Sequence, residues 1–315
     1  MTGNPIKIVD GIPFFSDDQY WGKSPKEELE TALRLIEEKG WEEFRANYHR
    51  KFDHTFEENR ADWRFVAPIS KDFEVLDAGA GMGRASIPLA RVAKNVTALD
   101  QSYLRMKFLK LRAEKEGLKN IKVNVGDIFD EPFEKESFDL IVMNGLLEWV
   151  GATNRFNDPR QAQLKSLRIC RNLLKKGGCL YIGIENRLAL SYLRGIDHSG
   201  LRFTSFLPRA LANVYMRLRK GKRYDTYTYT KRGYEKLLRE AGLNNNVKFY
   251  LPYPGYNLPR MMIPYDNLNA LSYAVRSITP RRGLKRKLAW FLVRSKILLQ
   301  LYRYFFFSFG IVVRK

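Results

Sequence analysis

Three aspartates in the first half of the chain have the type and the spacing to bind a polar ligand together. Asp77, Asp100 and Asp127 each end a short apolar run of the kind that forms a buried strand. Because the carboxyl ends of parallel strands meet at one edge of a sheet, we expect these carboxylates to line a ligand-binding edge. Carboxylates in that position bind hydroxyls, amines or cations.

A glycine-rich turn follows the first of these acids. Gly79, Gly81 and Gly83 occupy alternate positions after Asp77, and apolar residues at helical spacing come next. Glycine leaves the backbone bare, so a ligand can approach it closely. A dinucleotide would favour the spacing G-x-G-x-x-G, with its pyrophosphate at a helix N-terminus. The spacing here is G-x-G-x-G, and an acid so close to the turn would repel phosphate and suit a cation.

This pattern resembles that of the class I S-adenosylmethionine-dependent methyltransferases, over about residues 70–185. The resemblance implies that Asp77 and the glycines hold the methionine part of S-adenosylmethionine. It implies that Asp100 binds the ribose hydroxyls and that Asp127 meets the adenine amine. Asn144, at the end of the fourth predicted strand, would face the transferred methyl group and orient cofactor or substrate. The alternative interpretation is an ordinary α/β turn with solvated acids.

Two further residues are candidates for a general base, which a hydroxyl acceptor would need. Glu148 follows Asn144 closely, although it could equally favour the N-terminus of a following helix. His198 has the side chain best suited to take a proton near neutral pH, although a histidine in a loop is often simply solvated. An acceptor that is already anionic, such as a phosphate, would need no base. Cys170 and Cys179 have no metal-binding spacing, and we predict no metal site.

The elements that must position these residues alternate between strand and helix, which predicts a parallel sheet in an α/β fold. The resemblance implies a Rossmann-like sheet of seven strands in the order 3-2-1-4-5-7-6, with strand 7 antiparallel. The final apolar stretch fits that strand, because a central strand buried on both faces is apolar throughout. The strands are predicted near 73–77, 96–99, 121–125, 138–143, 179–184, 247–251 and 304–313, and the core helices near 84–93, 102–116 and 159–175.

Accessory segments surround this predicted core. Residues 1–68 are interpreted as an N-terminal helical cap whose aromatic residues pack against one another. The methyltransferase domain would span 69–315, with basic insertions at about 186–228 and 257–303. The second insertion contains one amphipathic basic helix, over about 284–302, which is usable at a membrane surface although packing on the sheet is the commoner fate. Its charges interrupt every apolar run, so we expect no spanning helix.

The charge of the chain is unevenly distributed. The 315 residues have a formal net charge of +21. Residues 1–150 contain 22 Lys/Arg and 27 Asp/Glu, a net of −5, whereas residues 151–315 contain 33 and 7, a net of +26. A strongly basic half indicates an anionic partner, such as a phosphorylated substrate, anionic lipid or nucleic acid. With two cysteines and no signal pattern, we expect a cytoplasmic protein.

The sequence therefore predicts a methyltransferase, and three hypotheses describe its action. Looser similarity to methyltransferases of surface-polysaccharide pathways favours a hydroxyl or phosphate of a glycan or lipid-linked saccharide, met by a peripheral enzyme at the inner face of the membrane. The alternative is an RNA methyltransferase, whose basic half would track the backbone. The third hypothesis is a catalytically inactive methyltransferase fold that acts as a binding protein. The segments that carry the polysaccharide similarity are 20–22, 184–187, 197–200, 227–230 and 252–256.

Overall fold

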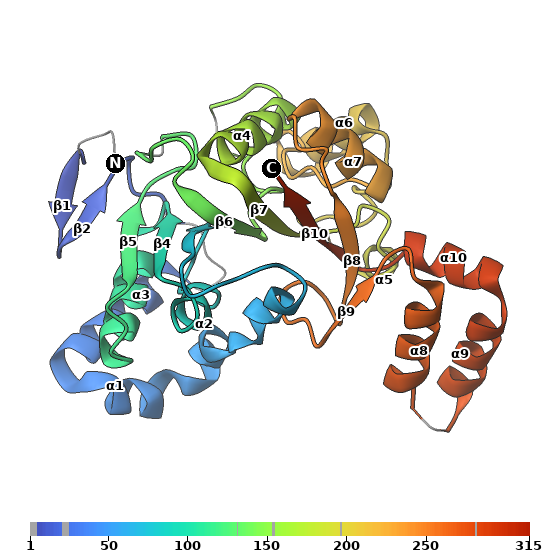
Figure 1. Cartoon of the computed structure of the whole chain (residues 1–315), viewed down its shortest axis with the longest axis horizontal. Coiled ribbons are helices and arrows are strands. Elements are labelled where there is room, and N and C mark those ends of the chain that lie inside the picture. The colour runs from blue at the N-terminus through green and yellow to red at the C-terminus, as the bar shows by residue number, and fades with distance from the viewer. Residues whose placement is uncertain (1–4, 21–24, 131, 153–154, 196, 281) are drawn as a thin grey trace. The chain divides into compact units, whose positions relative to one another are not determined.

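The computed structural model describes residues 5–20, 25–130, 132–152, 155–195, 197–280 and 282–315 (Figure 1). Trp21, Gly22 and Arg281, which the sequence analysis considered, lie outside the described residues. The contacts within the chain divide it into two compact units. The first unit comprises residues 1–143, 172–179 and 315, and the second comprises residues 144–171 and 180–314.

The described residues form ten strands, three more than the seven predicted. The strands are β1 (Lys7–Val9), β2 (Ile12–Phe14), β3 (Glu74–Ala78), β4 (Asn95–Asp100), β5 (Ile121–Val125), β6 (Phe138–Asn144), β7 (Leu174–Glu185), β8 (Lys248–Tyr253), β9 (Met261–Pro264) and β10 (Ser308–Arg314). Their order is β1-β2-β5-β4-β3-β6-β7-β10-β8-β9. The seven predicted strands are β3 to β8 and β10, and the additional ones are β1, β2 and β9. The predicted α/β, mostly parallel, Rossmann-like class is correct, whereas the strand count was too low.

The extra strands at the N-terminus show that residues 1–68 are not helical throughout. β1 and β2 form an antiparallel hairpin in which Val9 lies opposite Ile12. The two residues between them, Asp10 and Gly11, both have positive φ, of 51° and 69°, as a tight hairpin turn with right-handed strand twist requires. β2 then pairs with β5 in parallel. An Asp-Gly pair between apolar residues is the signal that would have predicted this hairpin.

The helices begin and end close to the predicted positions in the core and differ from them in the accessory segments. They are α1 (Lys26–Phe56), α2 (Ser86–Ala90), α3 (Tyr103–Lys115), α4 (Pro159–Leu173), α5 (Ser191–Arg194), α6 (Arg209–Lys220), α7 (Lys231–Glu240), α8 (Leu268–Ile278), α9 (Leu284–Arg294) and α10 (Lys296–Tyr304), with a 3₁₀ helix, η1, at Glu58–Phe65. The single amphipathic helix predicted over 284–302 is two helices. The Ser295 hydroxyl accepts a hydrogen bond from the backbone N–H of Leu298 at 3.3 Å and so caps a new helix.

The first unit places the three predicted acids along one edge of its strands. β3 pairs in parallel with β4 and β6, and β4 pairs in parallel with β5. In this register Asp77 lies opposite Ala98, and Asp100 lies opposite Val125. Because the strands run in the same direction, their carboxyl ends, and the acids that follow or end them, lie on the same side.

The aromatic residues of the long N-terminal helix pack against one another, as the sequence predicted, and also against α3. Phe44 and Phe52 of α1 and Phe108 of α3 are buried in one hydrophobic cluster. The ring centroids of Phe44 and Phe108 are 5.9 Å apart. Gly40 interrupts α1 with φ 85° and ψ 177°, so that the two parts of the helix are separated by a kink.

In the second unit, β10 is the buried strand beside β8. The two are antiparallel, with Ile311 opposite Phe249, and every residue of β10 except Arg314 is buried. The predicted apolar stretch at 304–313 therefore forms this strand, although α10 continues to Tyr304 and the strand begins at Ser308. None of the helices in the described ranges combines the length and apolar character needed to cross a membrane.

A buried arginine joins α3 to the residues that follow α1. The Arg112 guanidinium donates hydrogen bonds to the backbone oxygen of Thr55 at 2.7 Å and to Glu58 and Glu116 at 3.1 and 3.0 Å. Its side chain is 2% exposed. Arg91 contacts the same two glutamates, but its side chain is 46% exposed.

We predict that Arg112→Met lowers the free energy of unfolding by ~1–3 kcal/mol, because it leaves the buried Thr55 carbonyl without its donor. Arg91→Met removes a contact to the same acids from an exposed position, where a pair contributes at most ~1 kcal/mol. Urea unfolding of both variants measures the difference. Equal losses for the two variants would contradict the structural role assigned to Arg112.

Candidate active site

The glycine turn after β3 is braced by Asp100 and open on its other side. The Gly81 N–H donates to Asp100 Oδ2 at 2.9 Å, and the Ser102 N–H donates to Oδ1 at 3.0 Å. Gly79, Gly81 and Gly83 all have positive φ, of 73°, 56° and 84°, a conformation that favours glycine. A Cβ atom on Gly81 would meet no atom within 4 Å, so a ligand could reach this backbone.

Gly83 is required for a different reason. A Cβ atom at this position would lie 2.2 Å from the Cδ1 atom of Leu109 in α3. The turn therefore packs closely against α3 at Gly83 while remaining open at Gly81. The predicted alternation of glycines serves two purposes in one turn: close packing and ligand access.

Asp77 is buried beneath the turn. Its Oδ2 accepts a hydrogen bond from the Ser86 hydroxyl at 2.6 Å, and burial raises the pKa of the Asp77 carboxyl to about 6. This contact joins the end of β3 to the first residue of α2. The role of Asp77 toward the methionine part of the cofactor stays a prediction.

Asp127 is linked to the residue next to Asp100. Its Oδ2 accepts from the Gln101 side-chain amide at 2.7 Å, and its Oδ1 accepts from the Phe129 N–H at 3.0 Å. The structure thus brings Asp100 and Asp127 together at adjacent strand ends, as the sequence predicted. A carboxylate can accept several hydrogen bonds, so binding of a nucleoside at this edge is compatible with these contacts.

Asn144 is the last residue of β6, and its side chain lies across Gly183 of β7. A Cβ atom on Gly183 would come within 1.9 Å of the Asn144 Oδ1 atom. Only glycine at position 183 therefore allows the observed orientation of the amide. Asn144 follows Val142, the residue paired with Asp77 in the β3–β6 register, by two positions.

The second unit gathers the two predicted base candidates into one cluster. The His198 Nε2 atom lies 2.7 Å from Oε1 of Glu185. The Tyr256 hydroxyl lies 2.8 Å from the same Glu185 oxygen and 3.4 Å from Oε1 of Glu148. The indole of Trp149 contacts the His198 ring edge to face, with centroids 5.0 Å apart. Glu148 and His198, which are fifty positions apart in the sequence, therefore belong to one site.

The neighbouring residue Asp197 fixes the loop that carries His198. Its carboxylate accepts from the backbone N–H groups of Ser199 at 2.8 Å and Ser205 at 2.7 Å. The Ser199 hydroxyl lies 3.0 Å from that of Thr204. These bonds close the loop on itself, so His198 is not the simply solvated histidine that the sequence allowed.

Burial and mutual contact shift the pKa values of the two glutamates and the histidine of the cluster. Burial, with the negative charge of Glu185 adding to it, raises the pKa of the Glu148 carboxyl to about 8. Burial alone would lower the pKa of His198, but the contact with Glu185 outweighs it and raises the pKa to about 9. Burial opposes ionisation of Glu185 as well, and His198 holds its pKa below the ordinary value. At neutral pH the cluster therefore contains an ion pair of Glu185 with His198 and a protonated Glu148.

Sequence reasoning missed Glu185 and Tyr256 as site residues. Glu185 is the last residue of β7, and the rule that strand ends carry ligand groups could have found it. Tyr256 follows β8 in a loop, and no sequence signal relates it to Glu148. The alternative role of Glu148 at a helix N-terminus is not observed, because the next helix, α4, begins only at Pro159.

The same cluster has a geometry that could accommodate a cation. Ligand atoms of Glu148, Glu185 and His198 all lie within 4.8 Å of one another. Protons on His198 and Glu148 would balance the charges of the cluster in the absence of an ion. Activity measured with and without a chelator distinguishes a protonated cluster from one that binds a cation.

A mostly parallel sheet with carboxylates at its edge and an open glycine turn defines a Rossmann-like nucleoside-binding domain. Residues 69–200 match the family model described as "Methyltransferase domain". These residues form a class I S-adenosylmethionine-dependent methyltransferase domain, as the resemblance implied. S-adenosylmethionine is the cofactor of this class, and the open backbone at Gly81 beside Asp100 and Asp127 fits its nucleoside and amino-acid parts.

The chain is similar to curated methyltransferases and, more distantly, to solved structures. The ubiquinone biosynthesis O-methyltransferase of Methylocella silvestris is 30% identical over 164 residues, which are 48% of this chain and 59% of the relative. The chloroplastic 2-methyl-6-phytyl-1,4-hydroquinone methyltransferase of Arabidopsis thaliana is 34% identical over 128 residues, 40% of this chain and 34% of the relative. The YcgJ protein of Bacillus subtilis aligns over 82% of this chain and 97% of its own at TM-score 0.45 and 14% identity. The chain thus spans less than two thirds of the length of these curated relatives.

We predict that Asp100→Asn weakens binding of S-adenosylhomocysteine at least about tenfold, because an amide cannot replace both the carboxylate that braces Gly81 and the charge offered to the ribose. Asp139→Asn is the matched control. Asp139 also accepts from a backbone N–H, that of Glu74, but it lies near the opposite, amino end of β6. Calorimetry should find the affinity of the control unchanged, and an unchanged affinity of Asp100→Asn would remove Asp100 from the cofactor site.

Proposed function

We propose that this protein transfers the methyl group of S-adenosylmethionine to a hydroxyl oxygen of a small molecule. The observation that carries the proposal is the largely buried cluster of Glu148, Glu185, His198 and Tyr256. A hydroxyl must lose its proton as its oxygen becomes methylated, whereas an anionic acceptor does not, and this cluster is a system built to hold and move protons.

The names of the relatives favour the acceptor class. Two of them are named for ubiquinone biosynthesis and for a phytyl hydroquinone. These names favour a phenol- or quinol-type hydroxyl over the glycan or lipid-linked saccharide that the sequence analysis favoured. An apolar acceptor of this kind is consistent with the aromatic side chains of Trp149 and Tyr256 at the cluster.

His198 is the residue that we assign as general base. Its side chain is a quarter exposed, while that of Glu148 is fully buried, so His198 is more accessible to an acceptor. With Nε2 directed to Glu185, its Nδ1 atom is left to take the proton, and Glu185 stabilises the imidazolium that results. Glu148 and Tyr256 set the charge and orientation of Glu185.

S-adenosylmethionine supplies a methyl group bound to a positively charged sulfur. His198 would take the proton of the acceptor hydroxyl as its oxygen forms the bond to the methyl carbon, and the electron pair of the broken carbon–sulfur bond would stay on the sulfur of S-adenosylmethionine. The products are the methyl ether and S-adenosylhomocysteine, and the proton leaves His198 to water. Much of the rate enhancement comes from holding oxygen, carbon and sulfur in line.

The direct test is incubation with S-adenosylmethionine that carries an isotopically labelled methyl group. Mass spectrometry is then applied separately to three fractions of a cell extract: apolar small molecules, lipid-linked glycans and RNA. We expect the label on a hydroxyl in the first fraction. Label confined to the glycan fraction would restore the acceptor favoured by the sequence, and label confined to RNA would support the nucleic-acid alternative instead.

We predict that kcat/KM rises with pH through the range of about 8 to 9, because the cluster must lose a proton before it can accept one. Glu185→Gln should move this rise to lower pH. The negative charge of Glu185 raises the pKa values of both His198 and Glu148, so its removal lowers both, whichever of them is the base. The maximal rate should also fall, because the imidazolium loses its counter-ion.

Glu240→Gln is the control for this profile. Glu240 is a partly exposed glutamate paired with Arg160, and its replacement should leave the pH dependence unchanged. A purely structural role for Glu185 predicts a lower rate with no shift of the profile. We also expect a chelator to leave the activity unchanged. Activity that a chelator removes and a divalent cation restores would mean that the cluster binds a metal ion.

A further inference from the structure

The second unit contains three helices before its last strand, and two of them leave apolar stripes uncovered. α8, α9 and α10 contact one another, and α8 contacts β9 (Figure 1). Their mutual core is small: the buried residues include Leu271 and Val275 of α8, Ala289 of α9 and Leu299 of α10. The remaining apolar side chains of α9 and α10 lie largely on the outside.

The stripe on α9 has helical spacing. Leu284, Leu288 and Phe291 occur at positions i, i+4 and i+7, so they lie on one face of the helix. They are 72%, 61% and 65% exposed. Lys287, at position i+3 of the same face, is also exposed. A face with this spacing normally packs into the protein, but here it is open.

The stripe on α10 repeats the pattern. Ile297, Leu301 and Tyr304 again occur at i, i+4 and i+7, and they are 71%, 49% and 40% exposed. Two successive helices therefore each present a three-residue apolar stripe. Single exposed apolar residues are found on any protein, but a contiguous group of them marks an interaction surface.

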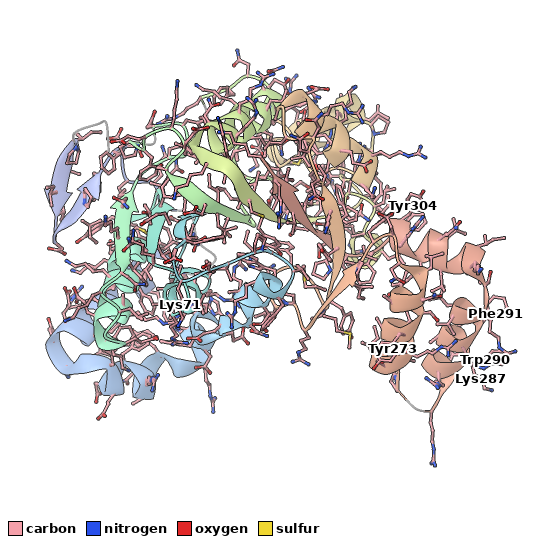
Figure 2. All side chains as sticks on the ribbon, in the orientation of Figure 1. Lys71, Tyr273, Lys287, Trp290, Phe291 and Tyr304 are labelled. Atoms are coloured by element: carbon pink, nitrogen blue, oxygen red, sulfur yellow. The ribbon has the colours of Figure 1, made fainter. Side chains whose placement is uncertain are left out.

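Aromatic rings and cations surround these stripes. Trp290 is half exposed, and the Arg294 guanidinium lies 3.4 Å from the centre of its ring. Arg286, Lys287, Trp290 and Phe291 line a hollow of about 510 Å³. Figure 2 shows Lys287, Trp290 and Phe291 close together on α9, with Tyr273 on α8. Such a hollow offers positive charge and apolar surface at one place.

The charge of residues 268–304 indicates what this surface binds. Residues 268–304 contain nine Lys/Arg and no Asp or Glu. The bases are Arg276, Arg281, Arg282, Lys285, Arg286, Lys287, Arg294, Lys296 and Arg303. We infer that this segment, residues 268–304, binds the surface of an anionic lipid bilayer, with the cations at the headgroups and the apolar stripes below them.

An anionic bilayer would explain both the cations and the exposed apolar stripes of this surface. The negative surface potential of an anionic bilayer attracts Lys and Arg side chains. Aromatic and aliphatic side chains enter the boundary between the headgroups and the acyl chains. RNA would account for the cations and the aromatic rings, but it gains little from exposed Leu284, Leu288, Ile297 and Leu301. The absence of a spanning helix among the described residues agrees with peripheral binding.

The inference does not depend on the proposed function, and vesicles test it directly. The whole chain is floated with vesicles of phosphatidylcholine alone, or of phosphatidylcholine with one third phosphatidylglycerol. We expect flotation with the anionic vesicles at low salt, little with neutral ones, and release by high salt, because exposed charges are screened beyond a Debye length. Equal flotation with both kinds of vesicle would overturn the charge-based part of the inference.

Two double variants separate the contribution of the charges to vesicle binding from that of the apolar stripes. Arg286→Gln with Lys287→Gln should weaken partition to anionic vesicles about fivefold for each charge removed. Leu288→Ser with Phe291→Ser should weaken it at least about tenfold. Both variants should keep wild-type affinity for S-adenosylhomocysteine, which shows that the rest of the fold is intact.

Matched controls come from other surfaces of the chain. Lys71→Gln with Lys119→Gln removes the same charge from exposed positions of the first unit (Lys71 is labelled in Figure 2), and it should leave partition nearly unchanged. Leu211→Ser with Leu218→Ser alters α6, which also exposes apolar residues. Loss of binding in the α6 variant but not in the α9 variants would overturn the assignment. So would an absence of flotation combined with salt-sensitive retention of RNA.

Discussion

The close approach of a fully buried carboxyl group, that of Glu148, and a largely buried one, that of Glu185, is the constraint on which the candidate active site depends. Two ionised glutamates side by side in a buried place would repel each other and lose their hydration, at a cost of several kcal/mol. Glu148 and Glu185 remain there because one is protonated and the other is paired with His198 and Tyr256. Protons on His198 and Glu148 therefore stabilise the cluster at neutral pH, and the proposed role of His198 as a general base depends on the loss of one of them at higher pH.

The residues that satisfy this constraint come from the accessory segments rather than from the strands alone. Glu185 ends β7, but His198 belongs to the insertion that follows it and Tyr256 to the loop after β8. The insertion is fixed locally, because Asp197 accepts hydrogen bonds from the backbone on both sides of the loop. The strand ends of the methyltransferase domain thus carry the acids and glycines predicted to bind the cofactor, and the accessory segments complete the cluster to which we assign the proton transfer.

The sequence by itself determined the elements whose signals are local. Asp77, Asp100 and Asp127 could be placed at one edge because apolar runs and glycine stops define parallel strands, and parallel strands end on the same side. The glycine turn could be recognised because positive φ and an open backbone require glycine. The apolar C-terminal stretch could be identified as a buried strand for a similar reason. The missed hairpin at Asp10-Gly11 and the helix break at Ser295 were also local signals, and they were available in the sequence.

Only the tertiary structure decided which distant residues meet. Glu148, Glu185, His198 and Tyr256 are separated by up to about a hundred positions, and a loop histidine or a tyrosine after a strand has no spacing that assigns it a partner. The pKa shifts of Glu148, Glu185 and His198 follow from burial and from their mutual contacts, which no sequence pattern contains. The exposed stripes of α9 and α10 depend on the fold in the same way, since helical spacing shows that a face is apolar and packing alone shows whether that face is covered.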